Sequence, residues 1–189
     1  SFVRMEVVTL SRMRFVALVS GGKDSIYSAL ECIKNGHELI ACVHLGAPES
    51  TDEESYMYQT AASEVVRTLV EDCLEVPLLL YQRVGKSINT SMVYQNDDSS
   101  SERDEVEDLF LALQQAKEKY NVQAVSSGAI LSTYQRVRIE HVCSRLGLTS
   151  LSYLWRLLPQ KELLQRMLED GIVAVIVRAA CPPGLVPRK

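Results

Sequence analysis

The sequence predicts an α/β fold, a three-layer sandwich built on a mostly parallel sheet of five to six strands. Two observations support this prediction. Short apolar runs alternate with segments of helical periodicity along most of the 189 residues, which is typical of a parallel sheet covered by helices on both faces. A glycine-rich segment, residues 20–25, follows the first apolar run and opens the first helix. In such folds ligands bind at the carboxyl ends of the strands, near a switch in strand order.

The predicted strands are short apolar runs bounded by turn-forming residues. They cover residues 14–19, 38–45, 76–81, 122–126, 151–154 and 172–177.

The predicted helices have apolar residues at i, i+3, i+4 and i+7 spacing. They cover residues 25–35, 51–69, 106–113, 132–146 and 160–170. Two of them begin with a capping-box pattern, at Thr51 and at Ser132, where Gln135 is the third helical residue. Between the strands and helices lies one long polar segment, residues 83–103, which predicts either a functional loop or a disordered one.

The length predicts one domain over residues 13–180, with residues 1–12 as a leader or linker and residues 181–189 as a tail. Hydrophobic residues make up 47% and charged residues 23%, which excludes a disordered chain. The net charge of −4 argues against a large nucleic-acid surface, and we expect no direct nucleic-acid partner. No apolar run approaches the roughly 18 residues of a membrane span, so we expect no membrane association.

The five cysteines are scattered and contain no Cys-x-x-Cys pair. This pattern argues against zinc and disulfide frameworks and indicates a reducing, cytoplasmic compartment.

The glycine-rich segment predicts a phosphate-binding loop. Its backbone N–H groups open a helix whose dipole favours anions, and two glycines let a phosphate approach closely. The lysine neutralises phosphate charge, and the last serine either caps the helix or donates its hydroxyl. The alternative is a plain tight turn, which leaves the glycines and the lysine unexplained. The residues are Ser20, Gly21, Gly22, Lys23, Asp24 and Ser25.

This segment resembles the PP-loop, Ser-Gly-Gly-x-Asp-Ser, of the ATP pyrophosphatases, the adenine nucleotide alpha-hydrolase superfamily. Further segments resemble the diphthine–ammonia ligase branch of that superfamily: residues 55–60, 104–109, 127–140, 143–148 and 151–155. The resemblance runs from residue 13 to about residue 180 and implies a Rossmann-like (HUP-type) ATP-binding domain. It implies the ATP-dependent amidation of diphthine on elongation factor 2 by ammonium, through an acyl-adenylate, releasing AMP and pyrophosphate.

The resemblance implies that Lys23 and Asp24 are catalytic and that the whole loop binds ATP and pyrophosphate. It adds His44, through its main chain at the adenine, and Gly128 to the ATP site. Mg²⁺ is the implied metal, with Asp24 as its ligand.

The resembling segments also imply a substrate site, for which each residue has a structural alternative. The implied residues are Tyr58, Gln59, Glu105, Asp108, Tyr134, Gln135, Arg136 and Arg138. The arginines bind an anion or pair with Glu140 or the acidic helix. Glu105 and Asp108 lie off the predicted core face, where they either bind a cation or form a solvated acidic surface. Gln135 is also a cap residue.

A second hypothesis for these segments is a cage for the quaternary ammonium of diphthine. Its aromatic members are Tyr56, Tyr58, Tyr134 and Trp155.

Two departures from the family are visible. Arg103 stands where the family usually has glycine before the acidic motif. Past residue 180 nothing matches the family's Gly-Glu-Gly-Gly-Glu-Tyr-type region, which implies a nucleotide-binding half without its completing half. Two alternatives remain: another PP-loop enzyme, such as a tRNA-modifying one, and a non-catalytic nucleotide-binding protein.

Overall fold

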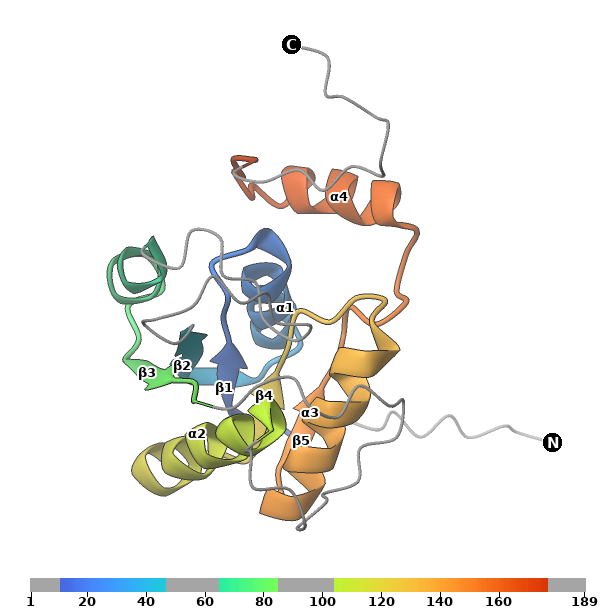
Figure 1. Cartoon of the computed structure of the whole chain (residues 1–189). Helices are drawn as coiled ribbons and strands as arrows, with labels where there is room; N and C mark the ends of the chain where they lie inside the picture. The colour runs from blue at the N-terminus through green and yellow to red at the C-terminus, as the bar shows by residue number, and fades with distance from the viewer. Residues whose placement is uncertain (1–10, 47–64, 85–103, 177–189) are drawn as a thin grey trace, which may run out of the picture.

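The computed structural model describes residues 11–46, 65–84 and 104–176. Five strands form one parallel sheet in the order β3-β2-β1-β4-β5 (Figure 1). Their bounds are β1 Arg14–Leu18, β2 Glu38–Gly46, β3 Leu78–Gln82, β4 Ala124–Ser126 and β5 Thr149–Leu151. The predicted α/β class and parallel sheet are therefore confirmed.

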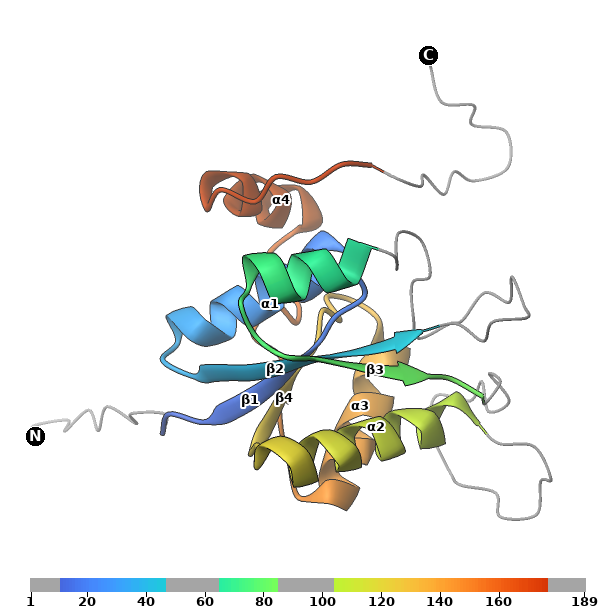
Figure 2. The same ribbon diagram turned by 90° about the vertical axis from the view of Figure 1, so that its left-hand side faces the viewer.

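Helices cover both faces of the sheet and complete three layers (Figure 2). One face carries α1 (Lys23–Lys34) and the π-helical turn η2 (Thr68–Cys73), and the other carries α2 (Glu105–Tyr120) and α3 (Thr133–Leu146). The fourth helix, α4 (Gln160–Glu169), lies on the outer side of α1, away from the sheet.

The central strand β1 explains how the layers are held together. Its side chains alternate between the two apolar cores: Phe15 and Ala17 belong to the α1 side, whereas Val16 and Leu18 belong to the α2–α3 side. Phe15, Val16 and Ala17 are fully buried. A strand covered on both faces has no solvent side, so its sequence is a continuous apolar run rather than an alternating one.

Two strand predictions are wrong. Residues 172–176 form no strand, and Val173 is 94% exposed. The run is apolar, but within the described part of the chain no neighbouring strand pairs with it. The fifth strand was predicted at residues 151–154, but it ends at Leu151. It ends there because the chain turns after Ser152, and Leu154 packs under α4 instead. The capping box at Thr51 lies outside the described residues.

The helix starts agree better with the sequence. The side chain of Ser132 accepts a hydrogen bond from the Gln135 backbone N–H at 3.3 Å, as the capping box predicts. Within the described ranges no helix combines the length and the hydropathy that crossing a bilayer requires.

Candidate functional site

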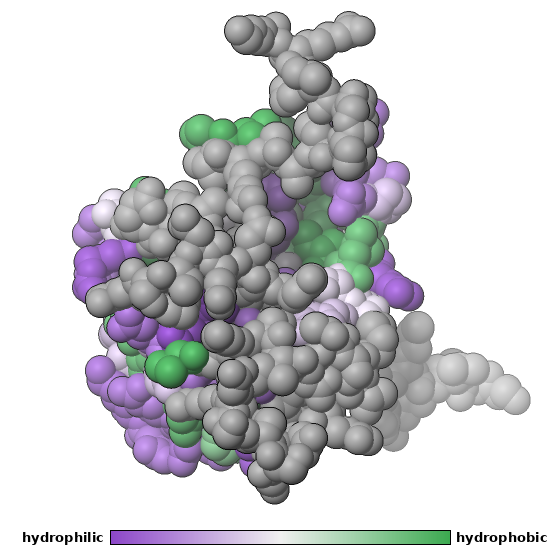
Figure 3. Space-filling model, in the orientation of Figure 1, coloured by the Kyte–Doolittle hydropathy of each residue, from purple (hydrophilic) through white to green (hydrophobic). Residues whose placement is uncertain are grey.

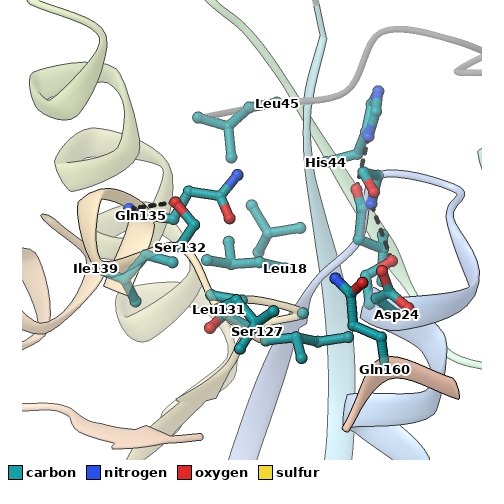
Figure 4. Close-up of a pocket in the computed structure, with 17 residues that line it drawn as sticks. Leu18, Asp24, His44, Leu45, Ser127, Leu131, Ser132, Gln135, Ile139 and Gln160 are labelled. Carbon is teal, nitrogen blue, oxygen red and sulfur yellow. Dashed lines mark hydrogen bonds between the residues drawn. The ribbon is translucent and has the colours of Figure 1, made fainter. Parts of the chain in front are cut away.

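A pocket of about 250 Å³ opens at the carboxyl edge of the sheet (Figure 4). The ends of β1 and β2, the first turn of α1, the loop that follows β4, and the starts of α3 and α4 form its walls. β1 is the strand from which the sheet order runs outward to β2 on one side and to β4 on the other. The pocket therefore lies where the fold class predicts a ligand.

The glycine-rich loop forms one wall and leaves the start of α1 open. Gly21 has a φ of 82°, a left-handed conformation that glycine adopts without steric cost. Gly22 is the N-cap residue, and no side chain caps the helix. The Ser25 hydroxyl donates to the Gly22 carbonyl at 2.9 Å and accepts from the Ser20 N–H at 3.3 Å. The N–H groups of the first helical turn have no acceptor within the helix, which suits an anionic ligand.

Lys23 and Asp24 form an ion pair beside this loop. The Lys23 ammonium lies 2.8 Å from Asp24 Oδ1, and both side chains are about one-third exposed, at 38% and 33%. Asp24 lines the pocket, whereas Lys23 does not contact it directly. The pair is open to solvent, so either partner remains accessible to a ligand.

Gly128 allows the loop after β4 to touch the start of α1. A Cβ at this position would come within 2.6 Å of the Ser25 backbone nitrogen. Nearby, the buried Ser28 hydroxyl donates to the Ser127 carbonyl at 2.8 Å. These contacts fix the spacing of two pocket walls, and they explain why glycine stands at this position.

His44 lines the pocket from the end of β2 and has a structural bond of its own. Its Nδ1 lies 2.8 Å from the Val19 carbonyl oxygen, so this nitrogen carries the proton and donates. The side chain is buried and ties the end of β2 to the end of β1. The expected contact of the His44 main chain with adenine remains a prediction.

The structure brings part of the predicted site together. The predicted residues that line the pocket are Ser20, Asp24, Ser25, His44, Gly128 and Gln135. The predicted residues that do not line it are Gly21, Gly22, Lys23, Glu105, Asp108, Tyr134, Arg136 and Arg138. Tyr58 and Gln59 lie outside the described residues.

The two arginines of α3 have partners within the chain. Arg136 pairs with Glu140 at 2.6 Å and lies 4.8 Å from the centre of the Trp155 ring. Arg138 is fully buried, with its guanidinium 3.3 Å from the centre of the Tyr134 ring. The structural alternative therefore holds for Arg136. Both rings already contact a guanidinium, which leaves less aromatic surface for the cage hypothesis.

One of the two alternatives for the start of α2, a solvated acidic surface, is wrong. Glu105 and Asp108 are buried, at 1% and 0% exposure, although they were expected to lie off the core face. Glu105 pairs with the buried Arg83 at 3.2 Å, and Asp108 accepts a hydrogen bond from the Val84 N–H at 2.8 Å. Helical periodicity does not reveal this burial, because the partner Arg83 follows strand β3 and lies outside the helix. A carboxylate that is paired with a cation can be buried, whereas an unpaired one is costly to bury.

Two residues at this edge of the sheet were not predicted from the sequence. Arg83 donates to the Gly46 carbonyl from both its backbone nitrogen and its Nε, each at 3.2 Å, and so joins β2 to β3. Gln160, the first residue of α4, lines the pocket from a helix that follows the last strand. Only the position of Gln160 directly after Pro159, at a predicted helix start, could have drawn attention to it.

The three buried cysteines of the described part of the chain do not contribute nucleophiles to this site. Cys32, Cys42 and Cys143 are buried, and burial raises the pKa of each thiol to about 12. At neutral pH they are protonated, and none of them lines the pocket.

Comparisons with known proteins identify relatives of this chain. The family model described as "Diphthamide synthase N-terminal domain" matches residues 13–150. Diphthine–ammonia ligase of Bos taurus is 44% identical over 181 residues, covering 94% of this chain and 65% of the relative. The Homo sapiens protein of the same name is 43% identical with the same coverage. The chain thus spans about 65% of the length of these relatives. A solved U34-tRNA thiolase from Methanococcus maripaludis superposes with a TM-score of 0.46 and 14% identity, covering 96% of this chain and 63% of the thiolase.

Proposed function

The chain belongs to the diphthine–ammonia ligase family, and from that premise we propose that it takes part in the ATP-dependent amidation of diphthine on elongation factor 2. The reaction consumes ammonium and ATP and yields diphthamide, AMP and pyrophosphate. The observation that carries the proposal is the uncapped start of α1, which opens into the pocket at the carboxyl edge of the sheet.

ATP occupies this pocket with its phosphates at the glycine-rich loop. The first-turn N–H groups of α1 and the positive end of its dipole attract the phosphate chain. Lys23, whose ammonium now neutralises Asp24, adds a mobile positive charge. The adenine lies toward the end of β2, where Val43, His44 and Leu45 line the pocket. Gly128 supports the site by allowing its two walls to touch.

The chemistry then needs positioning and electrostatic stabilisation rather than a protein nucleophile. The carboxylate of diphthine attacks the α-phosphorus, the bond to the bridging oxygen breaks, and pyrophosphate leaves with its electron pair. Ammonia attacks the carbonyl of the acyl-adenylate, loses a proton and displaces AMP. The loop amides and Lys23 stabilise the charge that grows on the leaving pyrophosphate.

Mg²⁺ fits this site as a metal bound mainly by the substrate. Within the described ranges no group of three or more His, Cys, Asp or Glu side chains is arranged to hold a metal ion. Asp24 offers a single carboxylate on the pocket wall. Mg²⁺ in nucleotide sites is commonly bound by one or two carboxylates together with phosphate oxygens, and it supplies neutralisation of the phosphate charge. Asp24 is therefore the residue that would hold it.

The remaining predicted residues belong to the diphthine side of the site. Gln135 is the best supported, since it lines the pocket from the start of α3. For Tyr134, Arg136 and Arg138, we propose a role in shaping the neighbouring wall, since Arg138 packs on the Tyr134 ring and Arg136 on the Trp155 ring. Tyr58 and Gln59 remain substrate-binding proposals.

Glu105 and Asp108 support the carboxyl edge of the sheet from the start of α2. Their burial beside Arg83 and Val84 favours this supporting role over direct contact with diphthine. The protein substrate, a translation factor, places the reaction in the cytoplasm.

The test combines nucleotide binding with product analysis. ATP affinity is measured by calorimetry on the 189-residue chain. Pyrophosphate release is then followed with and without elongation factor 2 that carries diphthine. Release of pyrophosphate and AMP that depends on the factor supports the ligase. Formation of ADP would contradict the mechanism. ATP binding without release would instead favour a nucleotide-binding role.

A further inference from the structure

Gln160 lines the pocket from a helix that lies outside the three-layer core. It is the first residue of α4, and it lines the same pocket as Ser20 and Asp24 of the glycine-rich loop. In Figure 4 its carboxamide extends from α4 toward the wall that carries Asp24. The side chain is exposed, so its amide is accessible to a ligand in the pocket.

The packing of α4 on α1 sets the position of Gln160. Leu163 and Met167, one and two turns further along α4, are 2% and 1% exposed. They form a separate apolar cluster with Tyr27 of α1 and with Leu154. Because α4 is anchored on the helix that begins at the glycine-rich loop, its first residue is held at a fixed distance from that loop.

Polar contacts hold the other end of α4 on the same helix. Arg166 lies 3.2 Å from the buried Glu31, and Asp170 lies 2.6 Å from the Lys34 ammonium. The Tyr27 hydroxyl donates to Asp170 as well. Charge pairs and an apolar cluster thus fix the direction of α4, which points its start at the pocket.

We propose that Gln160 is a further nucleotide-binding residue, whose carboxamide NH₂ group donates a hydrogen bond to the phosphate chain of ATP beyond the α-phosphate. This inference rests on the proposed function. A carboxamide offers two N–H donors without charge. It can therefore bind a phosphate oxygen and leave the ion pair between Lys23 and Asp24, at 2.8 Å, undisturbed. The start of α4 also lacks a side-chain cap, so no side chain occupies the N–H groups of its first turn.

The experiment compares Gln160→Ala with Gln165→Ala on the same helix. Gln165 hydrogen-bonds to Glu169 at 3.0 Å and does not line the pocket, which makes it a matched control. The affinities of ATP and AMP are measured by calorimetry. We expect Gln160→Ala to weaken ATP binding about 3- to 10-fold, the usual net effect of one hydrogen bond, and to leave AMP binding unchanged. Gln165→Ala should change neither.

Each contrary result has its own meaning. Unchanged ATP affinity in Gln160→Ala overturns the inference and leaves the proposed function standing. Equal weakening of ATP and AMP also overturns it, because the residue would then support the shape of the pocket and would not touch the phosphates. A second variant, Gln160→Glu, keeps the length of the side chain and should weaken ATP more than Gln160→Ala does. Failure of the unsubstituted chain to bind ATP overturns the proposed function and this inference with it.

Discussion

Gly128 and the backbone of Ser25 touch so closely that a methyl group on Gly128 would come within 2.6 Å of the Ser25 nitrogen. The contact joins the loop after β4 to the first turn of α1. It therefore sets the width of the pocket at the point where the phosphates of ATP are proposed to lie.

Gly128→Ala is expected to damage both stability and binding. The atoms nearest the added methyl group are backbone atoms, which cannot rotate away, so α1 or the loop must shift. Overpacking of this kind costs about 1–3 kcal/mol, measurable by denaturant unfolding. ATP affinity should fall as well, because the shift displaces the pocket wall at the proposed phosphate site. Gly46→Ala is the control, because nothing lies within 4 Å of its added Cβ. Similar behaviour of the two variants would contradict the prediction.

Lys23→Ala should weaken ATP binding and leave the stability of the fold nearly unchanged. Its ammonium is exposed, and among the described residues it pairs with Asp24 at the surface, so the free energy of unfolding should change by less than about 1 kcal/mol. A charged hydrogen bond to phosphate is worth about 1.5–3 kcal/mol, so ATP affinity should fall about 10- to 100-fold. Lys119→Ala, at the exposed end of α2, serves as the control for charge. The role of Lys23 is disproved if ATP binds both variants equally well.

Glu105→Ala should lower the free energy of unfolding more than Glu107→Ala does. The substitution removes the carboxylate that pairs with the buried Arg83 at 3.2 Å, and breaking a buried pair costs about 3–5 kcal/mol. Glu107→Ala removes a partly exposed pair with Arg145 and should cost less than about 1 kcal/mol. Urea unfolding of both variants tests this. A Glu105→Ala variant as stable as Glu107→Ala would contradict the stabilising role of the buried Arg83–Glu105 pair.

His141 should titrate below its ordinary value of 6.5. Burial, followed by the positive charge of Arg145, lowers the pKa of this imidazole, although Glu107 opposes the shift. The folded chain then binds the proton less tightly than the unfolded chain. Its contribution to stability is complete above pH 6.5 and is lost as the pH falls below that value. NMR titration of the ring protons measures the shift. In Arg145→Gln the pKa should rise, and an unchanged value would remove Arg145 as a cause.

Thiol reactivity should distinguish Cys73 from the buried cysteines. Cys73 is exposed, whereas burial raises the pKa of Cys32, Cys42 and Cys143 to about 12. In a Cys181→Ser background, Ellman's reagent should label one thiol rapidly in the native chain and all four in denaturant. Rapid labelling of a second thiol under native conditions would show that one of the two sheet faces opens.

The parts of the fold that follow from local chemistry could be predicted from the sequence. The run at β1, the capping box at Ser132 and the glycine-rich loop each depend on neighbouring residues, so the pattern contains the information. The strand expected at residues 172–177 fails in its described part because a strand requires a partner, which an apolar run alone does not specify. The turn after Ser152 depends likewise on the packing of Leu154 against a distant helix.

The candidate site divides in the same way. Ser20, Asp24 and Ser25 reach the pocket because they lie in one motif at one helix start. Glu105 was misplaced because its partner, Arg83, comes from a different strand end. Gln160 was missed because its place in the pocket results from packing between α1 and α4. The positions of Glu105 and Gln160 depend on contacts between residues far apart in the sequence, which the residue types alone do not reveal.

The separate apolar cluster under α4 has a consequence for hydrogen exchange. Its members Leu163 and Met167 belong to neither of the two cores that enclose the sheet, so α4 can unfold locally while both cores stay intact. The amide hydrogens of α4 should then exchange with solvent sooner than those of β1. One wall of the ATP pocket would thus open at a free energy below that of global unfolding, and bound nucleotide should slow the exchange.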